Sequence, residues 1–265
     1  MPDFNKGARR AIDDPLADDF SDRINRHIDA HFVRENKQEA EDAPRPYIGA
    51  SGIGNVCPRA IQLEYIWQRF GNLPEGPGDW PAHIVRTFKA GHVFEDMAAA
   101  GIIGGGFDLS QYADVATKKQ HGFSVWGGQF RGHVDGLIFN GPVPLPFPLI
   151  WECKALNDNG TEKVLSEGLM KSKPGYYAQV QINQLMLGIH SPTWFTIINK
   201  NTSKWYHTLI GHDPKFAREL YAKAEYIFAT TEAGRLVPRP YNDPMEFQCR
   251  QFCERWNGAC WKLAA

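Results

Sequence analysis

The segment between Val115 and Trp151 most restricts what this chain can fold into. Its apolar residues alternate with polar ones in short runs that glycine and proline separate, which is typical of strands joined by tight turns. The chain on both sides has the apolar spacing of helices. We therefore expect an α/β fold with a mixed central sheet flanked by helices. The apolar runs are Phe123 with Val125, then Val134, Leu137 and Phe139, then Leu149 to Trp151.

The remaining elements follow from apolar spacing and from the prolines and glycines at their ends. No internal repeat is visible, so residues 46–265 are predicted to form one domain. We expect helices over residues 57–70, 83–100, 161–171, 175–189 and 213–233, and further strands over residues 193–199 and 204–210.

Residues 1–45 are predicted to form an N-terminal helix and a linker. An apolar side chain recurs at every fourth position, which predicts a helix over residues 15–35 with one narrow apolar face. The polar stretch over residues 36–46 is interpreted as the linker. The apolar face can pack on the chain itself, which we favour, or on a protein partner. Its members are Leu16, Phe20, Ile24, Ile28 and Phe32.

Composition limits the class of protein. The 265 residues carry 29 basic and 30 acidic side chains, so the net charge of −1 excludes a protein whose whole surface attracts nucleic acid, although a local basic groove stays open. The longest apolar stretch, residues 141–151, is short and contains four prolines, so no membrane span is expected. Residues 1–10 lack the apolar run of a signal peptide, and the five cysteines are an odd number. We therefore expect a cytoplasmic protein.

Two carboxylates and a lysine occur where strands are predicted. Alternate side chains of a strand share a face, so Glu152 and Lys154 lie together while Cys153 points the other way. If the strand that carries Asp135 and Gly136 is a neighbour, the charged groups converge. Paired carboxylates suit magnesium, which acidifies a bound water, and a lysine can orient that water or stabilise charge on a phosphate. The alternative is a solvated strand face, on which a Glu-x-Lys triplet is common.

The order of four motifs resembles the PD-(D/E)XK nuclease superfamily, and in particular its RecB-like and lambda-exonuclease-like branch. The resemblance covers about residues 50–260 and implies a restriction-endonuclease-like core that hydrolyses DNA with magnesium or manganese. The motifs are Gly91-x3-Glu95, Gly132-x-x-Asp135-Gly136, Glu152-x-Lys154 and Tyr176-x-x-Gln179.

The resemblance also implies a role for each matching residue. Asp135 and Glu152 match the ligands of the catalytic metal, and Lys154 matches the group that assists the attacking water. Glu95 falls where the first helix of the family supplies a further acidic or histidine ligand, and His92 is the alternative at that place.

The helix expected over residues 175–189 carries a glutamine at each edge of its apolar stripe. An edge position suits a side chain that reaches a site beside the core, and both Gln179 and Gln181 have one. The resemblance favours Gln179 as the functional residue. A glutamine that is simply solvated is the alternative.

Four of the five cysteines form a second candidate site. Cys249, Cys253 and Cys260 have the pattern C-x3-C-x6-C, and Cys57 lies far away in the sequence. One distant cysteine with a C-terminal trio resembles the iron–sulfur nucleases of the AddB type, which implies a 4Fe-4S cluster, with zinc as the alternative metal. The spacing departs from the two and five intervening residues usual in those relatives. Buried thiols that bind nothing are the other interpretation.

These observations favour a magnesium- or manganese-dependent deoxyribonuclease that acts in DNA recombination or processing, as an exonuclease rather than an endonuclease. One alternative is a non-catalytic module that binds nucleic acid with the same fold. Another is a metal–cysteine scaffold that acts as a partner adaptor through its N-terminal helix. The candidate catalytic residues are Glu95, Asp135, Glu152, Lys154 and Gln179.

Overall fold

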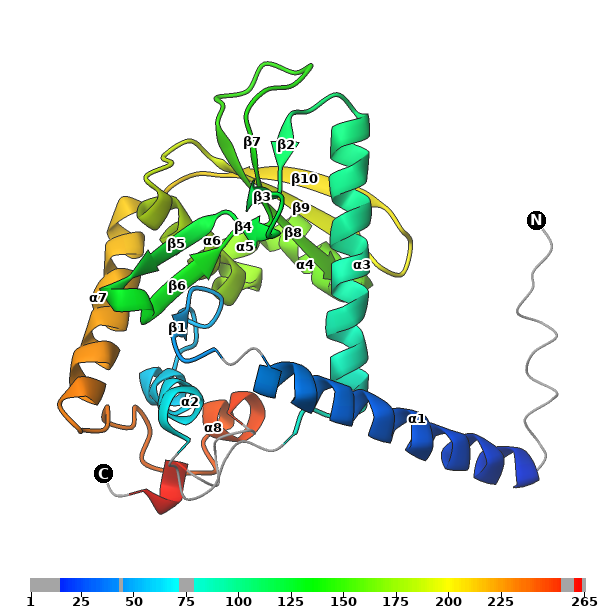
Figure 1. Cartoon of the computed structure of the whole chain (residues 1–265), viewed down its shortest axis with the longest axis vertical. Helices are drawn as coiled ribbons and strands as arrows, with labels where there is room; N and C mark the ends of the chain where they lie inside the picture. Colours follow the sequence, from blue (N-terminus) through cyan, green and yellow to red (C-terminus); the bar gives the residue numbers. More distant parts are fainter. Residues whose placement is uncertain (1–14, 43–44, 72–78, 254–259, 264–265) are drawn as a thin grey trace. The chain divides into compact units, whose positions relative to one another are not determined.

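The structure, a computed structural model, describes residues 15–42, 45–71, 79–253 and 260–263. Its chain divides into two compact units. The smaller one comprises Met1–Pro44 and Gly78–Ala90, and the larger one Arg45–Pro77 and Gly91–Ala265. Figure 1 names the helices and strands.

The smaller unit contains α1 (Pro15–Asp42) and the first part of α3 (Ala82–Gly104). Charged side chains connect the two helices, and all of them are partly exposed, so each pair contributes little by itself. The pairs are Arg86 with Asp29 at 2.5 Å, Lys89 with Glu35 at 3.3 Å and Lys89 with Glu39 at 3.0 Å.

Helix α1 confirms the helix predicted over residues 15–35 but is longer than predicted. It continues to Asp42, so the prediction that a linker begins at residue 36 was wrong. Residues 37–41, Lys-Gln-Glu-Ala-Glu, all favour a helix, which the interpretation as a linker overlooked, and Glu39 also pairs with Lys89 of α3.

The apolar face of α1 is only partly covered. Ile24 and Ile28 are each 44% exposed, and Phe32 is half-buried. The side chains of Leu16 and Phe20, which complete the predicted stripe, lie outside the part that the structure describes.

A five-stranded mixed sheet forms the centre of the larger unit, in the order β10-β9-β8-β7-β2. Strands β8 and β9 are parallel, and the other neighbouring pairs are antiparallel. The strands are β2 (Leu109–Ser110), β7 (Gly136–Ile138), β8 (Leu149–Leu156), β9 (Thr193–Asn199) and β10 (Trp205–Ile210).

Five further strands form two smaller sheets. One has the order β1-β6-β5, with β1 parallel and β5 antiparallel to β6, and the other is the hairpin β3-β4. The strands are β1 (Ile48–Gly49), β3 (Tyr112–Asp114), β4 (Lys119–Gln120), β5 (Gly122–Val125) and β6 (Phe130–His133).

The helices of the larger unit confirm the predicted ones, with two differences: α8 (Phe247–Phe252) was not predicted, and one predicted helix is interrupted. The helix predicted over residues 161–171 is divided in two by Gly168, whose φ of 80° no helix admits. The helices that follow α1, besides α3, are α2 (Pro58–Phe70), α4 (Asp158–Glu167), α5 (Leu169–Ser172), α6 (Pro174–Leu187), α7 (Pro214–Glu232) and α8 (Phe247–Phe252), and a short 3-10 turn covers Trp126–Gly128.

Alternate side chains of the central strands pack into two layers. On one face, Trp151 and Trp194 pack against the part of α3 that belongs to this unit. On the other face, Phe195 and Ile197 pack against α4, α5 and α6. This arrangement confirms the predicted mixed α/β fold with a central sheet between helices. Among the described residues, no helix is long and apolar enough to cross a membrane.

Gly136 begins β7 at a point where β2 passes close to it. A Cβ atom there would lie 2.6 Å from Leu109 Cδ1 and 3.0 Å from the carbonyl oxygen of Ser110. We expect Gly136→Ala to lower the free energy of unfolding by about 1–3 kcal/mol, measured by urea denaturation. Gly104→Ala is the control, because a Cβ at Gly104 meets nothing within 4 Å. Equal losses in both variants would contradict the prediction.

Candidate active site

Strand β8 carries two of the predicted site residues on one face. Glu152 is buried, with 1% of its side chain exposed, and Lys154 Nζ lies 2.5 Å from Glu152 Oε1. Cys153, between them, is buried on the opposite face, in the core that includes α3. The alternation predicted from the sequence is therefore present, and the charged pair faces away from the Cys153 core.

Asp135 lies opposite these residues, just before β7. The antiparallel register pairs Gly136 with Trp151, which brings the preceding residue level with Glu152. Asp135 Oδ2 accepts a hydrogen bond of 2.7 Å from the backbone nitrogen of Cys153. The backbone of β8 thus fixes the carboxylate of Asp135, and the same strand contributes the side chains of Glu152 and Lys154 to the site.

Helix α3 adds Glu95 to this group. Burial raises the pKa of Glu95 to about 7, with a further increase from the charge of Asp135 and an opposing effect from Lys154. The side chain of Glu95 is 21% exposed, whereas that of His92, 3.8 Å from it, is 79% exposed. The structure therefore brings Glu95, rather than the alternative His92, into electrostatic contact with the other site residues.

Burial and the neighbouring charges both shift the pKa values of the site residues. Burial raises the pKa of Glu152 to about 8, and Asp135 adds to the increase, while Lys154 opposes it. Burial alone would lower the pKa of Lys154, but Glu152 and Asp135 outweigh it and raise that pKa. The amine is therefore a cation that partly neutralises a cluster of carboxylates.

One carboxylate oxygen of the site has no donor. Glu152 Oε1 accepts from Lys154, but Glu152 Oε2 is buried and has no hydrogen-bond partner in the described chain. A buried acceptor without a partner is costly, and a divalent cation satisfies such an oxygen. The donor set of the site therefore fits a magnesium or manganese ion.

Helix α6 reaches the site with its first turn. The ring of Tyr176 lies 5.6 Å from Lys154 Nζ, a cation–π contact that the apolar pattern of the sequence does not reveal. Gln179 is half-buried about one turn further along. Gln181 is fully buried, donates to the Gly211 carbonyl at 2.8 Å and accepts from the Asp213 nitrogen at 2.6 Å, so it has a structural function.

The four cysteines outside the strand line a single small pocket. Cys57 precedes α2, Cys249 belongs to α8 and Cys253 follows α8, while Cys260 is buried close to the end of the chain. The fold therefore brings together thiols that lie far apart in the sequence.

These thiols influence one another. Burial raises the pKa of Cys57, and Cys260 adds to the increase. Burial also raises the pKa of Cys249, with additions from Cys57 and Cys260. A bound cation would remove this mutual repulsion of thiolates. Over the described residues, however, no three His, Cys, Asp or Glu side chains stand at the spacing of a formed metal site, either here or at the carboxylates.

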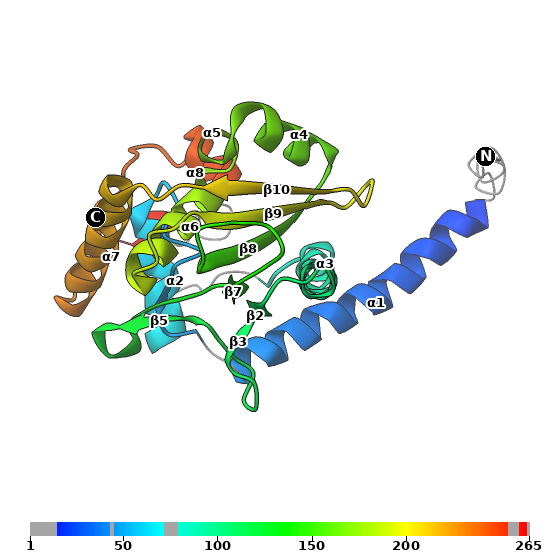
Figure 2. The same ribbon diagram turned by 90° about the horizontal axis from the view of Figure 1, so that it is seen from above.

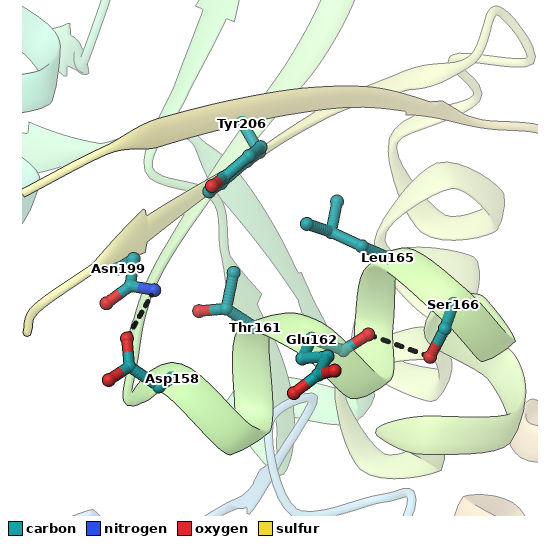
Figure 3. A pocket seen from close by; sticks show the side chains of 7 residues that line it. All are labelled: Asp158, Thr161, Glu162, Leu165, Ser166, Asn199 and Tyr206. Atoms are coloured by element: carbon teal, nitrogen blue, oxygen red, sulfur yellow. Dashed lines mark hydrogen bonds between the residues drawn. The ribbon is translucent and has the colours of Figure 1, made fainter. Parts of the chain in front are cut away.

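A separate surface pocket lies between α4 and the strands β9 and β10 (Figure 3). Asp158 Oδ1 accepts a 2.9 Å hydrogen bond from Asn199 Nδ2 at its edge. None of the residues predicted to be functional lines this pocket, so the candidate chemistry lies elsewhere. Its lining residues are Asp158, Thr161, Glu162, Leu165, Ser166, Asn199 and Tyr206.

Comparisons with known proteins support the fold. No protein-family model and no curated protein matches the sequence. The chain resembles the alkaline exonuclease LHK-Exo from Laribacter hongkongensis with a TM-score of 0.53 and 19% identity, over 74% of this chain and 93% of that chain. The same enzyme in complex with dAMP gives a TM-score of 0.49 at 18% identity, over 74% and 93% of the two chains.

A third solved structure, SSO0001, is similar with a TM-score of 0.46 and 14% identity, over 76% of this chain and 86% of that chain. At these identities, the likeness to LHK-Exo shows a shared fold. The fold predicted from the motifs is thus the fold of a known exonuclease.

The buried pair on β8 predicts a measurable coupling. Lys154→Met leaves Glu152 buried without its cationic partner and should lower the free energy of unfolding by about 3 kcal/mol. Without Lys154, the buried Glu152 must take up a proton on folding, because its pKa is already raised to about 8 with the lysine present. Adding Glu152→Gln removes that cost, so the double variant should regain part of the loss in urea denaturation at neutral pH with EDTA. Lys171→Met, which breaks the exposed pair with Glu167, is the control and should change little. A double variant no more stable than Lys154→Met would contradict this account.

Proposed function

We propose that the protein is a magnesium- or manganese-dependent deoxyribonuclease that removes nucleotides from DNA ends, as an exonuclease, in recombination or processing. The observation that carries the proposal is the gathering of Asp135, Glu152 and Glu95 around the amine of Lys154. The fold that the chain shares with an alkaline exonuclease supports the choice of reaction. The nuclease domain is assigned to residues 46–265 and the N-terminal helix with its linker to residues 1–45.

Asp135 and Glu152, with Glu95, would hold the divalent ion. Their carboxylate oxygens are the ligands that magnesium and manganese prefer, and Glu152 Oε2 has no other partner among the described residues. In the described chain, no three of these carboxylates stand close enough together to share one ion. Their oxygens must therefore approach one another when the ion binds. A bound ion supplies charge neutralisation and acidifies a water molecule.

Lys154 would position the attacking water and stabilise charge on the phosphate. Its raised pKa keeps the amine protonated, and Tyr176 restrains that amine from the side of α6. The water oxygen bonds to phosphorus and releases one of its protons to solvent, the bond between phosphorus and the leaving oxygen breaks, and the leaving oxygen takes up a proton from solvent, so that one water molecule is consumed. Gln179, on the same helix, would contribute a side-chain amide to the site.

The four cysteines are proposed to hold a 4Fe-4S cluster, with zinc as the alternative. Four thiolates are a suitable donor set for either, and all four cysteines line one pocket. Two cations lie beside the thiols: burial raises the pKa of Cys57 and Lys223 opposes that increase, while Arg59 donates a hydrogen bond to Cys260. The centre would join α2 to the C-terminal segment.

The catalytic proposal predicts a separation of cleavage from binding. Lys154→Ala should lower the rate of digestion of end-labelled DNA by at least about 100-fold, because it removes the only cation assigned to the reacting groups. Binding of DNA should remain, and EDTA should stop cleavage by the unaltered protein until magnesium or manganese is restored. Lys163→Ala, an exposed lysine of α4, is the control and should cleave normally.

Two outcomes contradict this proposal. Unaltered protein that leaves single- and double-stranded DNA uncut in both metals would exclude a nuclease. DNA binding without cleavage would instead favour a non-catalytic module with this fold.

The cysteine proposal predicts a bound metal. Protein purified without oxygen should show visible absorption and bound iron if the centre is a cluster, or bound zinc without that absorption. Cys249→Ser should lower the metal content, whereas Cys153→Ala, outside the pocket, should preserve it. Metal-free protein with an unchanged melting temperature would contradict a metal centre.

A further inference from the structure

The hairpin β3-β4 is a projecting part of the larger unit that no step of the proposed reaction uses. Its strands pair Tyr112 with Gln120 and Asp114 with Lys119, with a bulge between the two pairs. Within the described chain, the hairpin pairs with no further strand. Figure 2 shows it extending outward from the rim of the unit, away from β8. A two-stranded ribbon of this kind is marginal by itself, so its conformation must be held locally.

Asp114 holds the turn. Its Oδ1 accepts a 2.9 Å hydrogen bond from the nitrogen of Ala116, and its Oδ2 accepts one of 2.9 Å from Thr117 Oγ1. These bonds lower the pKa of Asp114, with that from Thr117 as the largest cause. The carboxylate is therefore ionised and directed into the turn.

The base of the hairpin is attached beside Asp135. The backbone nitrogen of Val134, the residue before Asp135, donates a 3.0 Å hydrogen bond to the carbonyl of His121. The other arm is joined at the same place, because Ser110 Oγ donates to the Tyr112 carbonyl at 3.0 Å and lies 2.9 Å from His121 Nε2. The position of the hairpin is thus set by the residues next to the candidate site.

The tip of the hairpin presents two cations and an apolar side chain to solvent. Val115 is 77% exposed, and Lys118 and Lys119 are exposed as well. Neither lysine forms an ion pair within the residues that the structure describes. Lys118 also has a φ of 53°, an uncommon left-handed conformation for a residue other than glycine. The charge of Lys119 also contributes to the lowered pKa of Asp114, and all three side chains of the tip are exposed.

We infer that the hairpin over residues 112–120 is a DNA-binding ribbon that docks on the duplex beside the bond to be cleaved. The major groove of DNA admits a two-stranded ribbon, and lysines at its tip neutralise phosphates without reading sequence. Val115 would contact sugar or base edges in the groove. The inference rests on the proposed function, which names DNA as the substrate. The hairpin would position that DNA for cleavage.

The test compares two variants that lose the same charge. Lys118→Ala/Lys119→Ala removes the cations of the tip, and Lys163→Ala/Lys215→Ala, the control, removes two exposed lysines of α4 and α7. Binding of a fluorescein-labelled DNA duplex is measured by anisotropy in EDTA, between about 50 and 200 mM salt. The hairpin variant should bind about tenfold or more weakly at the lower salt, and its plot of log affinity against log salt should be less steep by about 2. The control should bind as the unaltered protein does.

Cleavage assays separate this inference from the proposed function. In magnesium, the hairpin variant should show a raised KM for duplex DNA with an unchanged kcat, and Val115→Ser should show a smaller rise. If the unaltered protein binds DNA but cleaves none, the nuclease proposal fails, and a selective loss of binding in the hairpin variant still supports the ribbon. If the hairpin variant binds and cleaves as the unaltered protein does, or loses no more than the control, the inference is overturned.

Discussion

The ion pair between Lys154 and Glu152 is the interaction around which the rest of the candidate site is arranged. Glu152 is almost completely buried, and a buried carboxylate persists only where a cation or a hydrogen-bond donor compensates for lost water. Lys154 provides that cation on the same face of β8, two residues further along. The pair provides a donor to one carboxylate oxygen of Glu152 and leaves the other without one. A second cation at this place would interact favourably with that free oxygen.

Strand β8 belongs both to the hydrophobic core and to the candidate site. Odd-numbered residues of the strand, such as Trp151 and Cys153, pack with α3, while the backbone of Cys153 fixes Asp135. The parallel neighbour β9 is buried along its whole length and supports β8 from the other side. Strand β8 therefore packs with α3 through one face, while its other face presents Glu152 and Lys154 and then Leu156, which packs with residues of α4, α5 and α6. A change that displaces the strand would disturb stability and the site together.

The larger unit also joins segments that the chain separates widely. Cys57 lines one pocket with three cysteines of the C-terminal segment. Lys223 of α7 donates a 2.9 Å hydrogen bond to the carbonyl of Ile53, four residues before Cys57. A metal bound among the thiols would close a long loop and restrict the unfolded chain accordingly. The carboxylate site and the cysteine pocket would then have different functions: chemistry in one and the joining of chain ends in the other.

The local spacing of apolar and polar residues was enough to predict most helices of this protein and the faces of its central strand. Period-two alternation over residues 149–156 places Glu152 and Lys154 on one face, and apolar spacing marks most helices within a few residues, because both depend on backbone geometry alone. Tertiary structure decided the rest. The buried position of Gln181, for example, depends on the carbonyl of Gly211, which is distant in sequence. The choice of Glu95 over His92 likewise depends on which side of α3 meets the site, and no local pattern encodes such contacts, since they arise only when separate segments pack together.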